Sequence, residues 1–176
     1  MKKLSIIILL LICSLSSNAQ LLRFGIKGGV NFADLEGAEG TKMKTGYHFG
    51  GLVEIKLLEN LSVQPELLYS LQGADSDLDD FDDVDYNYIT VPVMAKFYVI
   101  TDRLSLEAGP QFAFLVNDNV DFEDPSTFDF AIDGGASAYI TKNFFVQARY
   151  VLGLTDTTKE AEVTNRVVQL SVGYRF

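Results

Sequence analysis

The single histidine, His48, is the side chain best suited to acid–base chemistry at neutral pH. A serine hydrolase combines a serine nucleophile, a histidine base and an orienting acid, and Ser70 and Glu54 are the partners predicted nearest to His48. The sequence around the serines shows no strained nucleophile turn, and residue alternation directs His48 away from the face that an acyl chain would contact. We therefore interpret His48 as a structural polar residue and predict no catalytic residues.

Seven aspartates between residues 75 and 85 supply the hard oxygen ligands that Ca²⁺ prefers, with Asp75, Asp77 and Asp79 as the candidate ligands. The run lacks the glycine that an EF-hand loop requires at its sharp turn, so a solvated acidic loop is the simpler interpretation. Through bound divalent cations, such a loop would also contact lipopolysaccharide phosphates. We expect no cofactor and no resident metal.

Six further ionisable residues stand at alternate positions within otherwise apolar segments. They are Glu54, Glu66, Lys96, Glu107, Asp133 and Arg149. A buried charge is costly unless it is paired, so we interpret these side chains as one structural polar network. The elements that carry them must turn all six toward the same enclosed space.

Those elements alternate apolar and polar side chains with a period of two, which is the pattern of β-strands. In the first segment, Phe24, Ile26 and Val30 alternate with Lys27 and Asn31. The pattern covers residues 24–32, 47–57, 61–71, 88–99, 104–116, 128–140, 144–154 and 168–176. Eight strands of about ten residues are long enough to cross a bilayer when tilted.

The connections between these segments alternate in length. Residues 33–45, 73–84, 117–127 and 155–164 are long and polar, whereas 58–60, 100–103 and 141–143 are short. Long outside loops and short periplasmic turns are typical of outer-membrane barrels, with both termini periplasmic. The predicted fold is all-β, an eight-stranded antiparallel up-and-down transmembrane β-barrel.

The cost of a charge decides which face meets lipid. At the bilayer midplane a charge costs about 2–4 kcal/mol on the lipid face of a barrel, so the six ionisable residues must line the interior. The opposite face carries aromatic residues near strand ends, as in interfacial girdles. A soluble lipocalin-like barrel would need the reverse arrangement, and eight strands leave a lumen that side chains fill, which disfavours a general diffusion pore.

The hairpin around residues 100–103 predicts one specific ion pair. If Val99 faces Leu104, antiparallel pairing keeps the two residue numbers at a constant sum of 203, which places Lys96 opposite Glu107. Both side chains then point inward, with Cβ atoms about 4.5–5.5 Å apart.

Three prolines break the strand rules. Pro65, Pro92 and Pro110 stand inside strand patterns, although proline cannot donate to a ladder and a closed barrel has no free edge. We therefore expect bulges or locally unpaired carbonyls at these positions.

Charge and the N-terminus indicate an exported protein. With 14 basic and 24 acidic residues the net charge is -10, which disfavours binding to nucleic acid. Two lysines, an apolar run over residues 4–15 and small residues at 17–19 form a secretory signal. We assign residues 1–19 to the signal peptide and 20–176 to one outer-membrane barrel domain. A lipoprotein acylated at Cys13 is the alternative, but an isoleucine stands where such signals have a small residue.

Several motifs carry a family resemblance. They are GIKGGVN at 25–31, QPELLYS at 64–70, ITVPVMAKFY at 89–98, LEAGPQ at 106–111, ARYVLGLTD at 148–156 and VGYRF at 172–176. In order and spacing they resemble the Bacteroidetes outer-membrane β-barrel family that includes PorT-like proteins. Tyr174 and the terminal Phe176 are similar to the C-terminal signal by which assembly machinery recognises such barrels, although Ser171 stands where a glycine is common.

The resemblance implies an outer-membrane location and leaves the role open. We expect a non-enzymatic barrel with a filled polar lumen and acidic outside loops, serving structure, surface interaction or PorT-like secretion. A narrow channel and an envelope enzyme acting on lipid A are the alternatives. The implied partners are outer-membrane lipid and lipopolysaccharide, the barrel-assembly machinery, and secretion or surface proteins.

Overall fold

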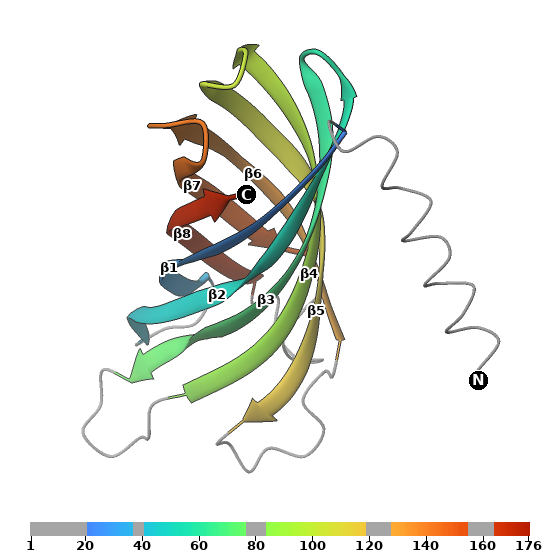
Figure 1. Ribbon diagram of the computed structural model, residues 1–176. Helices are drawn as coiled ribbons and strands as arrows, with labels where there is room; N and C mark the ends of the chain where they lie inside the picture. The colour runs from blue at the N-terminus through green and yellow to red at the C-terminus, as the bar shows by residue number, and fades with distance from the viewer. Residues whose placement is uncertain (1–20, 37–40, 77–83, 119–127, 155–163) are drawn as a thin grey trace, which may run out of the picture.

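The structure is a computed structural model that describes residues 21–36, 41–76, 84–118, 128–154 and 164–176. Its strands are β1 (Leu22–Glu36), β2 (Thr41–Leu58), β3 (Leu61–Ser76), β4 (Val84–Ile100), β5 (Leu104–Asp118), β6 (Phe128–Tyr139), β7 (Phe144–Gly153) and β8 (Thr164–Arg175). Each strand pairs antiparallel with the next, and β8 pairs with β1, which closes the barrel (Figure 1). The predicted eight-stranded up-and-down topology is confirmed. In the described part of the chain no helix is suited to crossing a membrane.

Most strands are longer than the predicted ten residues, and most of the additional residues lie at the end of the barrel that carries the long connections. β2 has 18 residues and β4 has 17. The ladders that pair each of them with β3 continue through polar sequence, because main-chain hydrogen bonds do not require apolar side chains. Residues 33–36 and 73–76, predicted as parts of loops, therefore belong to β1 and β3, and Asp75 pairs with Lys42 of β2. Asp77, Asp79 and the predicted signal peptide lie outside the described residues.

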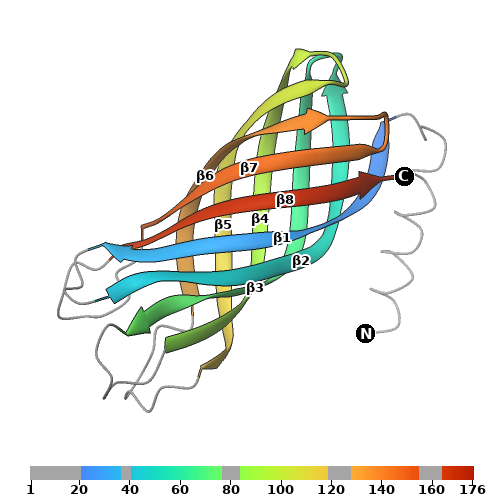
Figure 2. The same ribbon diagram turned by 90° about the vertical axis from the view of Figure 1, so that its left-hand side faces the viewer.

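The three short turns and the two described chain ends lie at one end of the barrel (Figures 1 and 2). The main-chain amide of Phe176 donates to the carbonyl of Phe24, at 2.8 Å, so the last residue is held against the start of β1. We call this end, with the turns at residues 59–60, 101–103 and 140–143, the short-turn end. The position of a residue along the barrel axis is given by its distance from this end.

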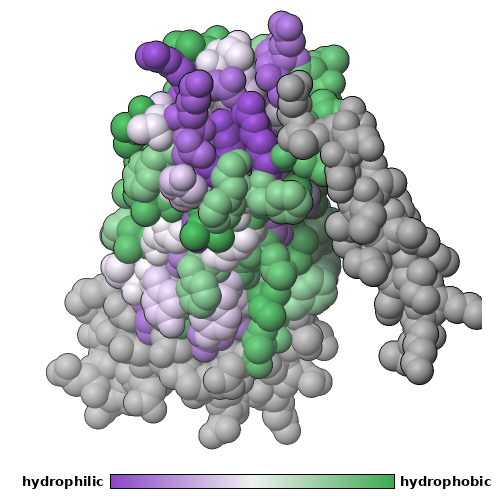
Figure 3. Space-filling model, viewed as in Figure 1, coloured by the Kyte–Doolittle hydropathy of each residue, from purple (hydrophilic) through white to green (hydrophobic). Residues whose placement is uncertain are grey.

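The outer face of the wall is apolar and the inner face polar, as the cost of buried charge predicts. Outward side chains such as Phe24 and Leu67 are 57% and 60% exposed, while Glu66 and Arg149 are 3% and 2% exposed. In Figure 3, hydrophilic residues gather at the short-turn end and apolar residues are prominent along the wall. The exterior is therefore suited to hydrocarbon and the interior to paired charges.

Inward-facing glycines allow neighbouring strands to approach closely. A Cβ on Gly29 would lie 1.9 Å from the carbonyl oxygen of Leu170, and one on Gly50 would lie 2.0 Å from that of Leu67. Only glycine leaves room for such approaches, which accompany the strong curvature of a small barrel.

The prolines interrupt pairing without shifting register. Between β2 and β3 the ladder stops at Leu52 and resumes at Ile55 with the same register, and this gap lies beside Pro65. Comparable gaps, again without a shift, lie beside Pro92 and Pro110. Of the two alternatives expected at the prolines, the structure shows interrupted pairing and not bulges, because the strand only has to forgo bonds that proline cannot donate.

Candidate functional site: a polar network that fills the barrel

Arg149 of β7 is the centre of the interior network. Its guanidinium forms a two-pronged contact with Glu66 of β3, with Nη1–Oε2 and Nη2–Oε1 distances of 3.0 and 2.8 Å. Glu107 lies 3.2 Å from the same guanidinium, and all three side chains are fully buried. Paired forks of this kind are among the strongest hydrogen bonds in proteins, because donor and acceptor are both charged.

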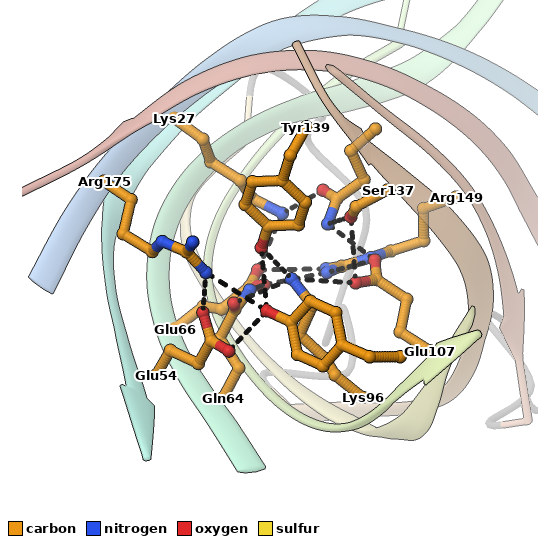
Figure 4. Close-up of polar contacts among 12 residues, drawn as sticks. Lys27, Glu54, Gln64, Glu66, Lys96, Glu107, Ser137, Tyr139, Arg149 and Arg175 are labelled. Atoms are coloured by element: carbon orange, nitrogen blue, oxygen red, sulfur yellow. Dashed lines mark hydrogen bonds and ion pairs between the residues drawn. The ribbon is translucent and has the colours of Figure 1, made fainter. Parts of the chain in front are cut away.

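Lys27 of β1 extends the network across the lumen. Its ammonium lies 2.7 Å from Glu66 and donates to the Gln147 amide oxygen, also at 2.7 Å. The Gln147 amide nitrogen donates to Glu107 at 2.5 Å and to Ser137 at 3.2 Å. Figure 4 shows Lys27, Glu66 and Glu107 converging from different strands on the interior of the barrel.

Lys96 and Glu107 occupy opposed positions, at the predicted sum of 203. Their charged atoms are 3.6 Å apart, which is an ion pair without a short hydrogen bond. The Lys96 ammonium donates instead to Gln64 at 3.1 Å and to Tyr139 at 2.9 Å. The predicted opposition of Lys96 and Glu107 is confirmed, but its premise is wrong at the turn. Leu104 pairs with Ile100 instead of Val99, and a register shift between Tyr98 and Ile100 brings the following pairs to the sum of 203. Glu107 makes its closer contacts with Arg149 and Gln147.

Asp133 of β6 is the least satisfied carboxylate of the network. It is fully buried, and its Oδ2 lies 3.5 Å from Arg149 while its Oδ1 has no hydrogen-bond partner. A buried carboxylate with so few donors is destabilising by itself. The other acids thus hold Arg149 more tightly than Asp133 does.

A second group of contacts lies nearer the short-turn end. Arg175 contacts Glu54 at 2.7 Å, and the Tyr98 hydroxyl donates to Glu54 at 2.5 Å. At the rim itself, Arg23 of β1 donates to Asp102 in the turn between β4 and β5, at 2.8 Å. This hydrogen bond lowers the pKa of the Asp102 carboxyl below its usual value of 3.8. The contact joins opposite parts of the wall and narrows the mouth of the barrel.

Aromatic side chains lie between these two groups, and the Tyr139 hydroxyl connects them, since it contacts both Lys96 and the Tyr98 hydroxyl. Tyr98, Tyr139, Phe145 and Leu52 form a buried apolar cluster, and the Tyr139 and Phe145 rings are 5.5 Å apart. The Arg175 guanidinium lies 4.4 Å from the Tyr139 ring centroid, within the range of cation–π attraction. Together, the ion pairs and the rings occupy the cross-section of the lumen.

His48 belongs to a third group, on the inner wall of β1, β2 and β8. Its Nδ1 lies 2.7 Å from the Asn31 amide oxygen and its Nε2 lies 2.8 Å from the Ser171 hydroxyl. Ser70 is the cross-strand partner of His48, as expected, but it accepts a hydrogen bond from Asn31 instead. Glu54 contacts Arg175 and Tyr98. The hydrolase trio considered from the sequence is therefore not assembled.

Serine, histidine and asparagine in this order resemble a nucleophile, a base and an orienting group. All three side chains are buried, with exposed fractions of 5%, 1% and 0% for Ser171, His48 and Asn31. Asn31 is held by three further contacts of its amide nitrogen, to Ser70 and to the carbonyls of Tyr47 and Leu71. The arrangement therefore resembles a rigid structural contact more than a site open to substrate.

The other candidate residues lie apart from the network. Tyr174 and Phe176 are on the outer face, 43% and 70% exposed, with ring centroids 5.4 Å apart. In the described part of the chain, no cluster of three or more His, Cys, Asp or Glu side chains is arranged to hold a metal ion. The interior contacts are instead made between acids and bases of the protein itself.

The selection of six ionisable residues from the sequence missed four members of the network, which are Lys27, Gln64, Gln147 and Arg175. Each stands on the polar face of a predicted strand, so the alternation already indicated an inward side chain. What the sequence lacked was a sign of which inward residues meet across the lumen, since the contact between Arg175 and Glu54 joins residues 121 positions apart.

Comparison with known proteins agrees with this architecture. Residues 17–159 match the family described as outer membrane protein beta-barrel domain. No curated protein matches the sequence.

Several solved structures share the fold. The attachment invasion locus protein Ail of Yersinia pestis is 19% identical with a TM-score of 0.55, and the match covers 88% of this chain and 97% of Ail. Neisserial surface protein A is 13% identical with a TM-score of 0.61, covering 87% and 97%. The N-terminal barrel domain of Pseudomonas aeruginosa OprF is 18% identical with a TM-score of 0.50, covering 86% and 97%. At these identities the likeness concerns the fold alone.

Proposed function

Because the chain belongs to the outer membrane protein beta-barrel domain family, we propose that it is a non-enzymatic, non-conducting barrel that presents surface loops for interaction. The observation that carries this proposal is the interior network, in which Arg149, Glu66, Glu107 and Lys27 are buried and contact one another across the lumen. Ions would have to break several charge-assisted contacts to pass. A rigid, filled barrel is instead suited to holding its loops in fixed positions.

Conductance in planar bilayers tests this proposal directly. The purified protein should give no discrete current steps at voltages where a general porin conducts. As a matched control, Glu66→Ala combined with Arg149→Ala removes the centre of the network and should raise the frequency of current steps. Regular single-channel steps from the unaltered protein would refute the non-conducting role and favour the narrow channel.

We place the short-turn end and both termini in the periplasm and the longer connections outside the cell. Support comes from the clustering of all three short turns at one end (Figure 1) and from the acidic sequence of residues 75–85. A specific protease site inserted between Asp79 and Asp80 should be cut in intact cells. The same site placed between Thr141 and Lys142 should be cut only after the outer membrane is opened; the converse result would invert the orientation.

The acidic connections favour cationic surface partners or lipopolysaccharide bridged by divalent cations. The Ail structure was solved with a heparin analogue, sucrose octasulfate, which is a polyanion. The seven aspartates between residues 75 and 85 would repel such a ligand, so we expect no heparin binding by this protein. Retention on a heparin column at physiological salt would contradict this expectation.

The resemblance to PorT-like proteins supports a secretion-associated role as an extension of the surface role. A deletion strain should then lose secreted proteins from the medium while keeping its lipid A unchanged. Altered lipid A mass spectra in that strain would overturn the non-enzymatic proposal, and Ser171→Ala would show whether the serine beside His48 is responsible.

A further inference from the structure

A groove of about 520 Å³ runs along the outer wall over β1, β5, β6, β7 and β8. Figure 2 faces β1, β6, β7 and β8 of this wall. Small residues, Gly28, Ala136 and Ala148, form part of its lining, and the larger Leu170 and Val146 border it. Its volume lies within the range of about 300–1,000 Å³ found for ligand pockets. The wall is therefore hollowed where small side chains leave room between larger ones.

The groove covers the depth of one membrane leaflet. It begins at Leu104 and Ala138, beside the turns of the short-turn end, and reaches Leu170 of β8. Leu170 is six residues from Phe176, about 20 Å along a strand and about 15 Å in depth at the usual strand tilt. That depth is about half of a hydrocarbon core of about 30 Å. The apolar lining thus matches an acyl chain that enters from the short-turn end.

Cationic side chains stand where the groove meets the short-turn end. Arg103 directly precedes Leu104, and Lys142 lies in the turn between β6 and β7; both are exposed. The apolar belt continues up to these turns, since Ile100 and Ile140 are 53% and 66% exposed. Arg103 and Lys142 therefore lie at the depth of the lipid headgroups.

The charge of this rim is opposite to that of the whole chain. Its accessible charged residues in the described part of the chain are the cations Arg23, Lys56, Arg103 and Lys142 and the anions Glu59 and Asp102. With the terminal carboxylate of Phe176, which lies at the same end, four cations against three anions give a net positive rim on a protein of net charge -10. Arg23 and Asp102 contact each other, which leaves the groove end clearly cationic. Basic residues at a membrane surface attract anionic headgroups.

We propose that the groove binds one acyl chain of an anionic phospholipid, while Arg103 and Lys142 hold its phosphate. The assignment of this lipid to the periplasmic leaflet rests on the proposed orientation of the barrel; the binding site itself does not. A zwitterionic lipid offers the same acyl chain with no net charge and should bind more weakly. A second copy of the chain would instead have to fill the concave wall with a complementary ridge, and it would bury the groove without needing the cations.

Native mass spectrometry of the full-length mature protein in detergent tests the site. The protein is incubated with an equimolar mixture of palmitoyl-oleoyl phosphatidylglycerol and palmitoyl-oleoyl phosphatidylcholine. One phosphatidylglycerol adduct should be retained as the detergent is removed in the gas phase, at several times the abundance of the phosphatidylcholine adduct. Equal retention of both lipids, or a dimer without lipid, would overturn the proposal.

Matched variants separate the two parts of the site. Arg103→Gln with Lys142→Gln should remove the preference for phosphatidylglycerol, whereas Lys56→Gln, on the same rim but on β2, should keep it. Ala148→Phe fills the groove and should reduce adducts of both lipids several-fold. Ala95→Phe, outward-facing on β4 outside the groove, should leave both unchanged. A specific site would be refuted if Lys56→Gln changed lipid preference as much as the Arg103 and Lys142 double variant does. It would also be refuted if Ala95→Phe reduced lipid adducts as much as Ala148→Phe does.

Folding and orientation are checked separately. Each variant is first shown to migrate as a compact band without heating, and Ala136→Phe replaces Ala148→Phe if that variant fails to fold. Absence of lipid selectivity in the correctly folded, unaltered barrel overturns the lipid site alone. An inverted protease pattern in cells overturns the proposed orientation and moves the lipid to the other leaflet. Conductance of the unaltered protein overturns the proposed function and leaves the lipid measurement standing.

Discussion

Arg149 and Glu66 show how single residues make a charged interior tolerable. Glu66 accepts from Arg149 through both oxygens, contacts Lys27 at 2.7 Å and accepts from Gln64 at 2.7 Å. Removing one partner of a buried pair leaves the other charge without compensation. The network therefore behaves as a unit whose members depend on one another.

The first prediction concerns this unit. Glu66→Gln keeps the shape of the side chain but leaves Arg149 and Lys27 short of an anion, so the free energy of unfolding should fall by about 3–5 kcal/mol. Denaturant unfolding of the protein in detergent, followed by gel mobility, measures the change. Glu59→Gln, in an exposed turn, is the control and should have little effect. Similar stabilities for both variants would show that the network contributes little.

The second prediction concerns the rim. The pKa of Asp102 is lowered by the hydrogen bond from Arg23, so its contribution to stability is present above its ordinary pKa of 3.8 and is lost as pH falls through the lower folded value. Asp102→Asn should therefore unfold at lower denaturant concentration than the unaltered protein at pH 7. The gap should close in strongly acidic solution. A difference that is independent of pH would contradict an ionic role for Asp102.

At the scale of elements, closely spaced strands depend on particular glycines. Gly46 and Gly109 approach the carbonyls of Leu71 and Val93 as closely as Gly50 approaches that of Leu67, whereas Gly134 on the outer face of β6 has open space. Glycine within a strand is ordinarily less favourable than alanine by about 0.5–1 kcal/mol. Glycine-to-alanine substitution should therefore destabilise the barrel at the closely approached inward glycines and stabilise it slightly at Gly134.

The third prediction uses this contrast. Gly50→Ala should lower the yield of folded barrel sharply, because its Cβ would lie 2.0 Å from the Leu67 carbonyl oxygen. Gly134→Ala should fold as well as the unaltered protein or slightly better. The fraction of compact, unheated protein after refolding into detergent gives the measurement. Equal yields would mean that the ladder between β2 and β3 can separate without cost.

At the scale of the whole molecule, closure leaves no free strand edge, and the apolar exterior requires lipid or detergent. The fourth prediction is that the protein fractionates with the outer membrane and migrates faster on SDS gels before boiling than after it. Closed ladders resist SDS until heat separates them. A single mobility under both conditions, together with recovery in the soluble periplasmic fraction, would be incompatible with a transmembrane barrel.

The sequence determined the number of strands, their order and the direction of each side chain, because alternation with a period of two follows from strand geometry alone. It also predicted that Lys96 opposes Glu107, although the turn pairs Leu104 with Ile100 instead of Val99 and a register shift beside the turn sets the sum of 203. The strand ends were less predictable. At residues 33–36 and 73–76 the ladder continues through polar sequence that resembles a loop.

Only the tertiary structure decided which inward side chains meet. Closure brings β8 beside β1, which places Ser171 within 2.8 Å of His48 and brings Arg175 of β8 to Glu54 of β2 over the inner face of β1. Such contacts depend on barrel curvature and on the reach of long side chains, neither of which leaves a periodic signal in the sequence. The outer groove has the same origin, because Gly28, Ala136 and Ala148 line one hollow only when the four strands β6, β7, β8 and β1 are aligned in register.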